Sequence, residues 1–218
     1  MVRRECVIKT IFEKKIIAIF RGIDPEKVVK TANALHRGGV SLMEVTFNQK
    51  EGDSGYESTV DSIRKIASEA NKEILIGAGT VLTEQQVVLA SNAGAEFIVT
   101  PTTDPAVIRL ANSLGMVTMP GAYTPTEINN AYKAGADFVK VFPASEVGCA
   151  YFKALHGPLG HIPLTAVGGV TMDNAKAFLA AGAVGLGIGG NLVSRKLIEN
   201  GDYLGLAELA EKFCESIR

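Results

Sequence analysis

One pattern that recurs along the chain limits its fold more than any other feature. A short apolar run is followed by a polar break and then by an amphipathic stretch, eight times in all. The runs are KIIAIF (15–20), SLMEVTF (41–47), EILIGAGT (73–80), EFIVTP (96–101), MVTM (116–119), FVKVFPA (138–144), IPLTAV (162–167) and VGLGI (184–188). Continuous apolar runs of this length are typical of strands buried on both faces of a parallel sheet.

Helix-start signals follow several of these runs, either Asp before Pro or a Thr with capping spacing. They are Asp24-Pro25, Thr83 with Gln86, Asp104-Pro105, Thr124 with Glu127, and Thr171. After the second run, the polar stretch through Gly55 is expected to be a loop, with a helix over residues 58–71. The segment 49–56 is a candidate lid or subunit contact.

Eight strand–helix units with short connections predict a (β/α)8 TIM barrel. A doubly wound open sheet is the alternative, but it rarely needs eight such even repeats. Residues 2–13 are expected to form an extra N-terminal helix that closes the barrel floor. With 218 residues and 47% hydrophobic content, the chain is expected to be a single domain over 1–218.

Composition excludes several classes of partner. The net charge is -1, and no basic run suggests a nucleic-acid surface. Three well-separated cysteines argue against a disulfide framework and favour a reducing compartment. Charged residues interrupt the N-terminal apolar residues, so neither a signal peptide nor a membrane span is expected. A cytoplasmic protein without membrane contact is the expectation.

Lys140 is the one charged residue in the sixth apolar run, flanked by Val139 and Val141. Burial disfavours an ammonium ion, so its pKa is expected to fall and leave a free amine at neutral pH. A neutral lysine can attack a ketone and form a Schiff base. The alternative is a lysine that extends to the rim of the sheet or pairs with a carboxylate.

Glu44 lies between apolar neighbours in the second run and is a candidate buried carboxylate. In a barrel, functional groups gather at the carboxyl ends of the strands, where Glu44 and Lys140 could meet. As a catalytic group, Glu44 would transfer protons while Lys140 is neutral. A structural ion pair is the alternative, and it predicts an ordinary charged lysine.

Two glycine pairs, Gly168-Gly169 and Gly189-Gly190, follow the seventh and eighth runs. Loops at these two positions of a barrel commonly bind phosphate through backbone N–H groups. Tight-turn geometry is the alternative. Arg21 follows the first run and could clamp a carboxylate, unless it makes a surface ion pair. No spacing of histidines or cysteines predicts a metal site, and no cofactor is expected.

These motifs together resemble the 2-keto-3-deoxy-6-phosphogluconate / 4-hydroxy-2-oxoglutarate aldolases, from about residue 10 to the C-terminus. The segments that carry the resemblance are EVT (44–46), GAGTVL (77–82), PG (120–121), TPTE (124–127), KVFPA (140–144) and GGV (168–170). The resemblance implies that Lys140 forms the Schiff base and that Glu44 is the general acid and base. It implies that Thr80 and Pro101 lie at the pyruvate carboxylate, that the glycine pairs hold phosphate, and that the protein is a homotrimer.

The chain departs from the family pattern at three places. Asn48 stands where many members have an arginine for the substrate carboxylate, and Arg21 could replace it, as in phosphogalactonate-specific relatives. Asn191 stands where a serine often follows the last glycine pair, and it remains a candidate phosphate donor. Val167 replaces a threonine that would meet the C4 hydroxyl, which should relax or invert preference between the gluconate and galactonate epimers.

We therefore expect a metal-independent class I aldolase that releases pyruvate and glyceraldehyde 3-phosphate. Cleavage of 4-hydroxy-2-oxoglutarate to pyruvate and glyoxylate is a second candidate activity. One alternative is a phosphate-binding barrel that acts on a sugar phosphate without a Schiff base, with Lys140 as an electrostatic group. The other is a non-catalytic relative that binds a keto-acid as a sensor.

Overall fold

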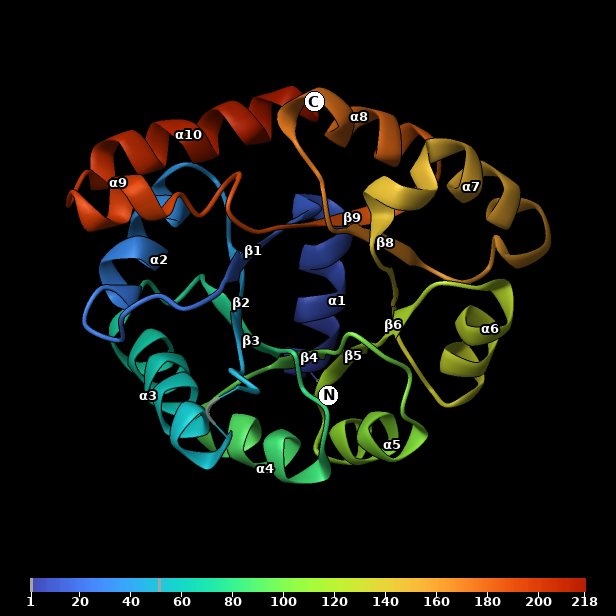
Figure 1. Ribbon diagram of the computed structural model, residues 1–218, viewed down its shortest axis with the longest axis horizontal. Coiled ribbons are helices and arrows are strands. Elements are labelled where there is room, and N and C mark those ends of the chain that lie inside the picture. Colours follow the sequence, from blue (N-terminus) through green and yellow to red (C-terminus); the bar gives the residue numbers. More distant parts are fainter. Residues whose placement is uncertain (1, 51) are drawn as a thin grey trace.

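The computed structural model describes residues 2–50 and 52–218, which form a ring of strands inside a ring of helices (Figure 1). The strands are β1 (Ile16–Phe20), β2 (Leu42–Thr46), β3 (Leu75–Gly79), β4 (Phe97–Val99), β5 (Val117–Met119), β6 (Gly121–Ala122), β7 (Val139–Val141), β8 (Leu164–Val167) and β9 (Ala183–Ile188). The helices are α1 (Val2–Lys14), α2 (Val28–Arg37), α3 (Gly52–Glu69), α4 (Glu84–Ala93), α5 (Pro105–Ser113), α6 (Pro125–Lys133), α7 (Ala144–Leu159), α8 (Met172–Ala180), α9 (Arg195–Glu199) and α10 (Tyr203–Ser216).

The sheet is parallel and closes into a barrel, which confirms the predicted fold and excludes the open sheet. Its strand order is β5-β4-β3-β2-β1-β9-β8-β7-β6. The two end strands, β5 and β6, are parts of one segment on either side of Pro120. The carbonyl of Pro120 accepts a hydrogen bond from Lys140 N at 2.8 Å, and that of Met119 accepts one from Thr100 N at 3.2 Å. Proline has no N–H to donate, so the strand is interrupted there. The predicted fifth run ended at residue 119, and the short strand β6 after Pro120 was not predicted.

Helix α1 closes the amino-terminal end of the barrel, as predicted. Val7 and Ile11 on this helix are fully buried. They pack against an inner cluster that includes Ile17 and Leu42, which stand at the starts of β1 and β2. A second, larger cluster fills the layer between the strands and the outer helices. The floor of the barrel is therefore solid, and the opposite end is left for the site.

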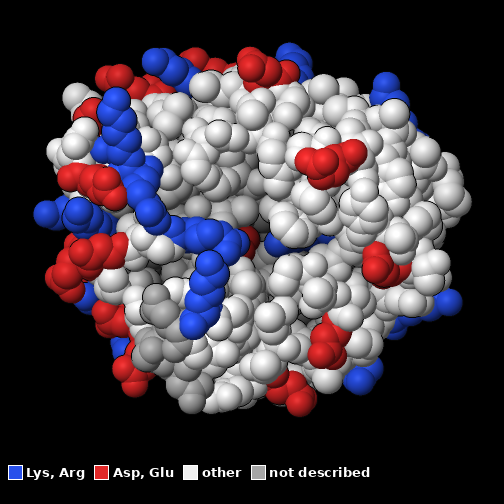
Figure 2. Space-filling view, viewed as in Figure 1, with Lys and Arg blue, Asp and Glu red and all other residues white. Residues whose placement is uncertain are grey.

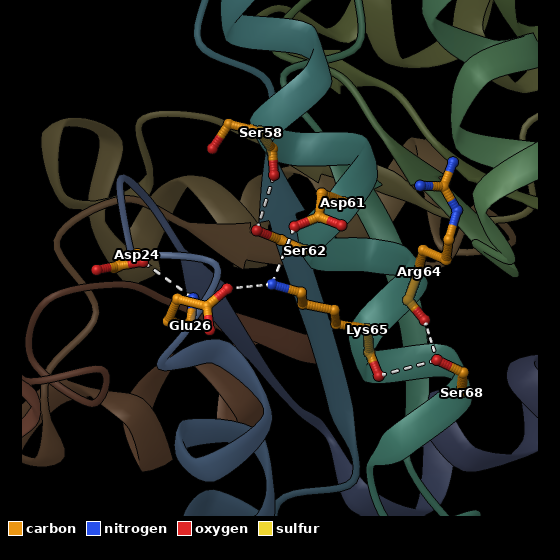
Figure 3. Close-up of polar contacts among 8 residues, drawn as sticks. All are labelled: Asp24, Glu26, Ser58, Asp61, Ser62, Arg64, Lys65 and Ser68. Atoms are coloured by element: carbon orange, nitrogen blue, oxygen red, sulfur yellow. Dashed lines mark hydrogen bonds and ion pairs between the residues drawn. The ribbon is translucent and has the colours of Figure 1, made fainter.

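Two helix starts differ from the sequence expectation. Helix α2 begins at Val28, because the Asp24 carboxylate accepts a hydrogen bond from Glu26 N at 2.9 Å and forms a separate turn (Figure 3). The start signals at residues 83, 104, 124 and 171 are confirmed as N-cap positions. The short helix α9 was not predicted.

Helix α3 begins at Gly52, several residues before the expected start at 58. Tyr56 packs edge-on against Phe47, with ring centroids 5.4 Å apart, and this contact holds the early turns against the barrel. Farther along, Lys65 joins α3 to the turn before α2, with Nζ 2.5 Å from Glu26 and 3.2 Å from Asp61 (Figure 3). Most of the expected 49–56 loop is thus helical, while Glu51, which also belonged to the candidate lid, lies outside the described residues.

No helix in the described part of the chain is long and apolar enough to cross a membrane.

Candidate active site

A cavity of about 450 Å³ opens at the carboxyl ends of the strands. Figure 2 shows the hollow at the centre of this face, with Lys and Arg side chains extending to its edge. Nearly all the predicted site residues line the cavity. They are Arg21, Glu44, Thr80, Pro101, Lys140, Val167, Gly168, Gly169, Gly189, Gly190 and Asn191. Residues from the two halves of the chain therefore converge on one site.

Lys140 lies in the middle of β7 with only 6% of its surface exposed. Its neighbours in the sheet are Gly121 and Thr165. Its Nζ is 4.8 Å from the centroid of the Phe142 ring, at the mouth of the cavity. Burial lowers the pKa of Lys140, and the nearby Arg21 lowers it further, against the opposing charge of Glu44. A larger fraction of this amine is therefore neutral at pH 7 than in an exposed lysine.

Glu44 lies on β2 and is only 3% exposed. Burial raises the pKa of this carboxyl, while Lys140 and Arg21 act in the opposite direction. No direct hydrogen bond or ion pair joins the described side chains of Glu44 and Lys140, although the charge of each acts on the pKa of the other. The two groups instead face the same cavity with pKa values moved toward each other, as acid–base chemistry at neutral pH requires.

Gly79 on β3 provides the space that the Glu44 carboxylate occupies. A Cβ atom at residue 79 would lie 1.7 Å from Oε1 of Glu44 and 2.4 Å from its Cδ. Any side chain there would displace the carboxylate. The sequence marked the GAGT segment only for its threonine, and the packing role of this glycine was missed, because a contact between neighbouring strands leaves no local signal.

Thr80 adopts a left-handed backbone conformation with φ of 55°, which is uncommon for a residue other than glycine. Its carbonyl accepts a hydrogen bond from Gln49 Nε2 at 2.6 Å. Gln86, fully buried, donates to Gln49 Oε1 at 3.1 Å and accepts from Leu82 N at 2.6 Å. This network fixes the turn that presents Thr80 to the cavity. Gln86 was expected to reach Thr83 N in a capping box, but it bonds to Leu82 N instead.

The two glycine pairs differ in what surrounds them. Gly168 and Gly169 have φ of 94° and 72°, and a Cβ at residue 169 would lie 2.3 Å from Ser145 Oγ. The positive φ angles of this tight turn are enough to explain why both residues are glycine. At Gly189 and Gly190 a Cβ would meet no atom within 4 Å. Packing does not require glycine at the second pair, so its bare backbone is left open to a ligand.

Arg21 and Asn48 were both predicted to bind a carboxylate, but only Arg21 lines the main cavity. Asn48 lines an adjoining hollow of about 430 Å³, which it shares with Arg21 and Thr80, and its Oδ1 accepts a hydrogen bond from Lys50 N at 3.1 Å. The same hollow is lined by Lys50 and Arg195, two cations that the sequence did not single out.

Within the described residues, no group of three or more His, Cys, Asp or Glu side chains is placed to hold a metal ion.

Several known proteins are similar to this chain in sequence and in fold. The profile of the family described as "Aldolase: KDPG and KHG aldolase" matches residues 7–209. The chain is 40% identical over 181 residues to the probable 2-dehydro-3-deoxy-6-phosphogalactonate aldolase of Rhizobium meliloti, across 83% of this chain and 82% of that protein. It is 32% identical over 214 residues to the 2-dehydro-3-deoxy-phosphogluconate aldolase of Haemophilus influenzae, across 97% of each. A solved structure described as "Native KDPGal structure" is similar with a TM-score of 0.81 and 36% identity, across 92% of this chain and 93% of that one.

Proposed function

This chain belongs to the KDPG and KHG aldolase family, and on that premise we propose that it cleaves a 2-keto-3-deoxy-6-phospho sugar acid to pyruvate and glyceraldehyde 3-phosphate. The observation that carries the proposal is the pair formed by Lys140 and Glu44. A buried amine of lowered pKa and a buried carboxyl of raised pKa face one cavity. The activity belongs to one domain over residues 1–218.

The proposed reaction begins when the neutral amine of Lys140 attacks the C2 ketone and forms a carbinolamine. Glu44 donates the proton with which water leaves, and an iminium ion results. The C4 hydroxyl then gives its proton through water to Glu44, the C3–C4 bond breaks, and its electron pair passes into the enamine. Glu44 returns a proton to C3, and hydrolysis of the iminium releases pyruvate and restores the amine.

The two anionic ends of the substrate fit different parts of the cavity. Arg21 and the hydroxyl of Thr80, beside Pro101, are proposed to hold the C1 carboxylate. The open backbone at Gly189 and Gly190 supports phosphate binding at the other end. Gly168, Gly169 and Asn191 line the same cavity, and we propose that they also bind the phosphate.

Borohydride trapping tests the proposal. Hydride reduction of the iminium formed with pyruvate should leave a stable secondary amine, found by mass spectrometry on the peptide that holds Lys140. An unmodified Lys140 under saturating pyruvate would rule out the Schiff-base mechanism. Release of pyruvate from 4-hydroxy-2-oxoglutarate, measured beside the phosphorylated substrate, tests the second activity.

Val167 is proposed to set the preference between C4 epimers. Its side chain is 4% exposed and lines the cavity without a polar group. Threonine has nearly the same shape and adds a hydroxyl that can bond to the C4 hydroxyl. We expect Val167→Thr to change the ratio of kcat/KM for the gluconate over the galactonate substrate by about tenfold, the effect of one hydrogen bond.

The measurement is the ratio of the two kcat/KM values in the variant and in the wild type. Pyruvate has no C4 hydroxyl, so borohydride trapping of pyruvate by the variant is the control and should match the wild type. An unchanged epimer ratio would remove Val167 from the specificity determinants.

A cytoplasmic homotrimer completes the proposal. It is supported by the family resemblance, and the molecular mass in solution, measured by light scattering, tests the assembly.

A further inference from the structure

Arg195, the first residue of α9, extends over the mouth of the barrel. It lines a hollow of about 320 Å³ together with Arg21, Gly189 and Gly190. All three of these residues also line the main cavity. Arg195 also lines the adjoining hollow that contains Lys50. Arg195 and the second glycine pair therefore line one hollow at this mouth.

The positive charge at this mouth forms no ion pair within the described part of the chain, although Arg21 acts on the buried carboxyl of Glu44. Of the described side chains, those that line the two hollows include no carboxylate. Among the described residues, none of the ion pairs involves Arg21, Lys50 or Arg195. Figure 2 shows the Lys and Arg side chains as a continuous strip that reaches the central hollow. A cluster of cations of this kind favours a multiply charged anion.

Arg195 is exposed and makes one long hydrogen bond from its guanidinium. Ser194 is the N-cap of α9, and its Oγ accepts a hydrogen bond from Leu197 N at 3.5 Å. Nη2 of Arg195 donates to the Gly22 carbonyl at 3.4 Å, a long bond that leaves other N–H groups of the guanidinium available. The planar guanidinium can donate two parallel hydrogen bonds to a phosphate, which a lysine cannot do.

We propose that Arg195 binds the phosphate group of the substrate from the solvent side, opposite the backbone at Gly189 and Gly190. This assignment rests on the proposed function, because it takes the phosphorylated keto-acid as the substrate. Arg195 would then discriminate phosphorylated substrates from unphosphorylated ones, while the chemistry at Lys140 stays unchanged.

The test compares Arg195→Met with Lys196→Met. Both variants remove one positive charge from neighbouring residues of α9, but Lys196 lines none of the hollows at the mouth. KM is measured with the phosphorylated keto-acid and with its unphosphorylated counterpart. Binding of glycerol 3-phosphate, measured by calorimetry, gives a readout that does not depend on catalysis.

Arg195→Met should raise KM for the phosphorylated substrate and weaken glycerol 3-phosphate binding by about tenfold or more, the loss of a charge-assisted hydrogen bond. KM for the unphosphorylated substrate should not change, and Lys196→Met should match the wild type. The proposal would be overturned if both variants lose the same binding affinity, or if KM rises equally for the two substrates. It would also be overturned if glycerol 3-phosphate binding is undetectable in the wild type or is unaffected by Arg195→Met. If pyruvate is never trapped but only Arg195→Met loses glycerol 3-phosphate binding, the aldolase function fails and the Arg195 site stands.

Discussion

Replacing Lys140 by methionine should abolish aldol cleavage, with kcat reduced on the order of 10⁴-fold or more. Methionine fills a similar volume in β7 but has no amine, so neither the carbinolamine nor the iminium can form. The loss is measured as pyruvate release, and borohydride trapping should disappear with it. Substantial cleavage by the methionine variant would contradict the Schiff-base mechanism.

Lys140→Arg separates the Schiff-base mechanism from its electrostatic alternative. A guanidinium stays protonated and cannot form an imine, but it retains the positive charge. If Lys140 acts only through its charge, Lys140→Arg should keep much of the activity that Lys140→Met loses. We expect both variants to be inactive.

Thermal unfolding distinguishes loss of chemistry from loss of fold in these variants. Burial lowers the pKa of Lys140, so between its folded pKa and the ordinary value of 10.5 the unfolded chain binds more protons. The contribution of Lys140 to stability therefore rises with pH across that window and is unfavourable below it. Lys140→Met removes this cost, and at neutral pH its melting temperature should equal or exceed that of the wild type.

Gly79→Ala should reduce kcat by about 10² to 10⁴-fold, the range expected when a general acid–base is lost. The new methyl group would stand 1.7 Å from Oε1 of Glu44, so the carboxylate must leave its place. Glu44→Gln keeps the shape of the side chain but cannot transfer the proton, so it should reduce kcat by a similar factor. The measurement is kcat for both variants, with glycerol 3-phosphate binding as evidence that the mouth of the site is intact.

Gly157→Ala is the matched control for that substitution. Residue 157 lies in α7, where an added Cβ would meet no atom within 4 Å. This variant should keep full activity. Pro158 follows residue 157 in the helix, and a Cβ before proline disfavours the helical conformation, so no gain in stability is expected. A fully active Gly79→Ala variant would show that Glu44 is not needed where the structure holds it.

The parts of the site that were predicted from the sequence depend on local patterns. Lys140 stands out because a charge inside a short apolar run is a candidate buried charge if the run is a strand. The paired glycines stand out because they follow the last two runs. Thr80 was found through its motif, whereas the network from Gln49 to Gln86 that fixes its turn was not.

Helix ends show where local patterns fail. Asp24 and Pro25 have the composition of a helix start, yet the Asp24 side chain closes a separate turn and α2 begins later. The polar residues before 58 have the composition of a loop, yet the packing of Tyr56 on Phe47 keeps them helical. In the first case a local side-chain hydrogen bond, and in the second the packing of a helix on a strand, selects between conformations of similar local energy.

The sequence by itself determined the barrel and its central pair, because strand and helix periodicities and a buried charge are properties of short segments. Only the tertiary structure decided which side chains share a cavity. Gly79 and Glu44 meet because β2 and β3 are neighbours, and Arg195 reaches the Gly22 carbonyl because β1 and β9 are neighbours in the closed barrel. Such contacts join residues far apart in the chain, and their distances depend on how strands are paired, which local periodicity does not specify.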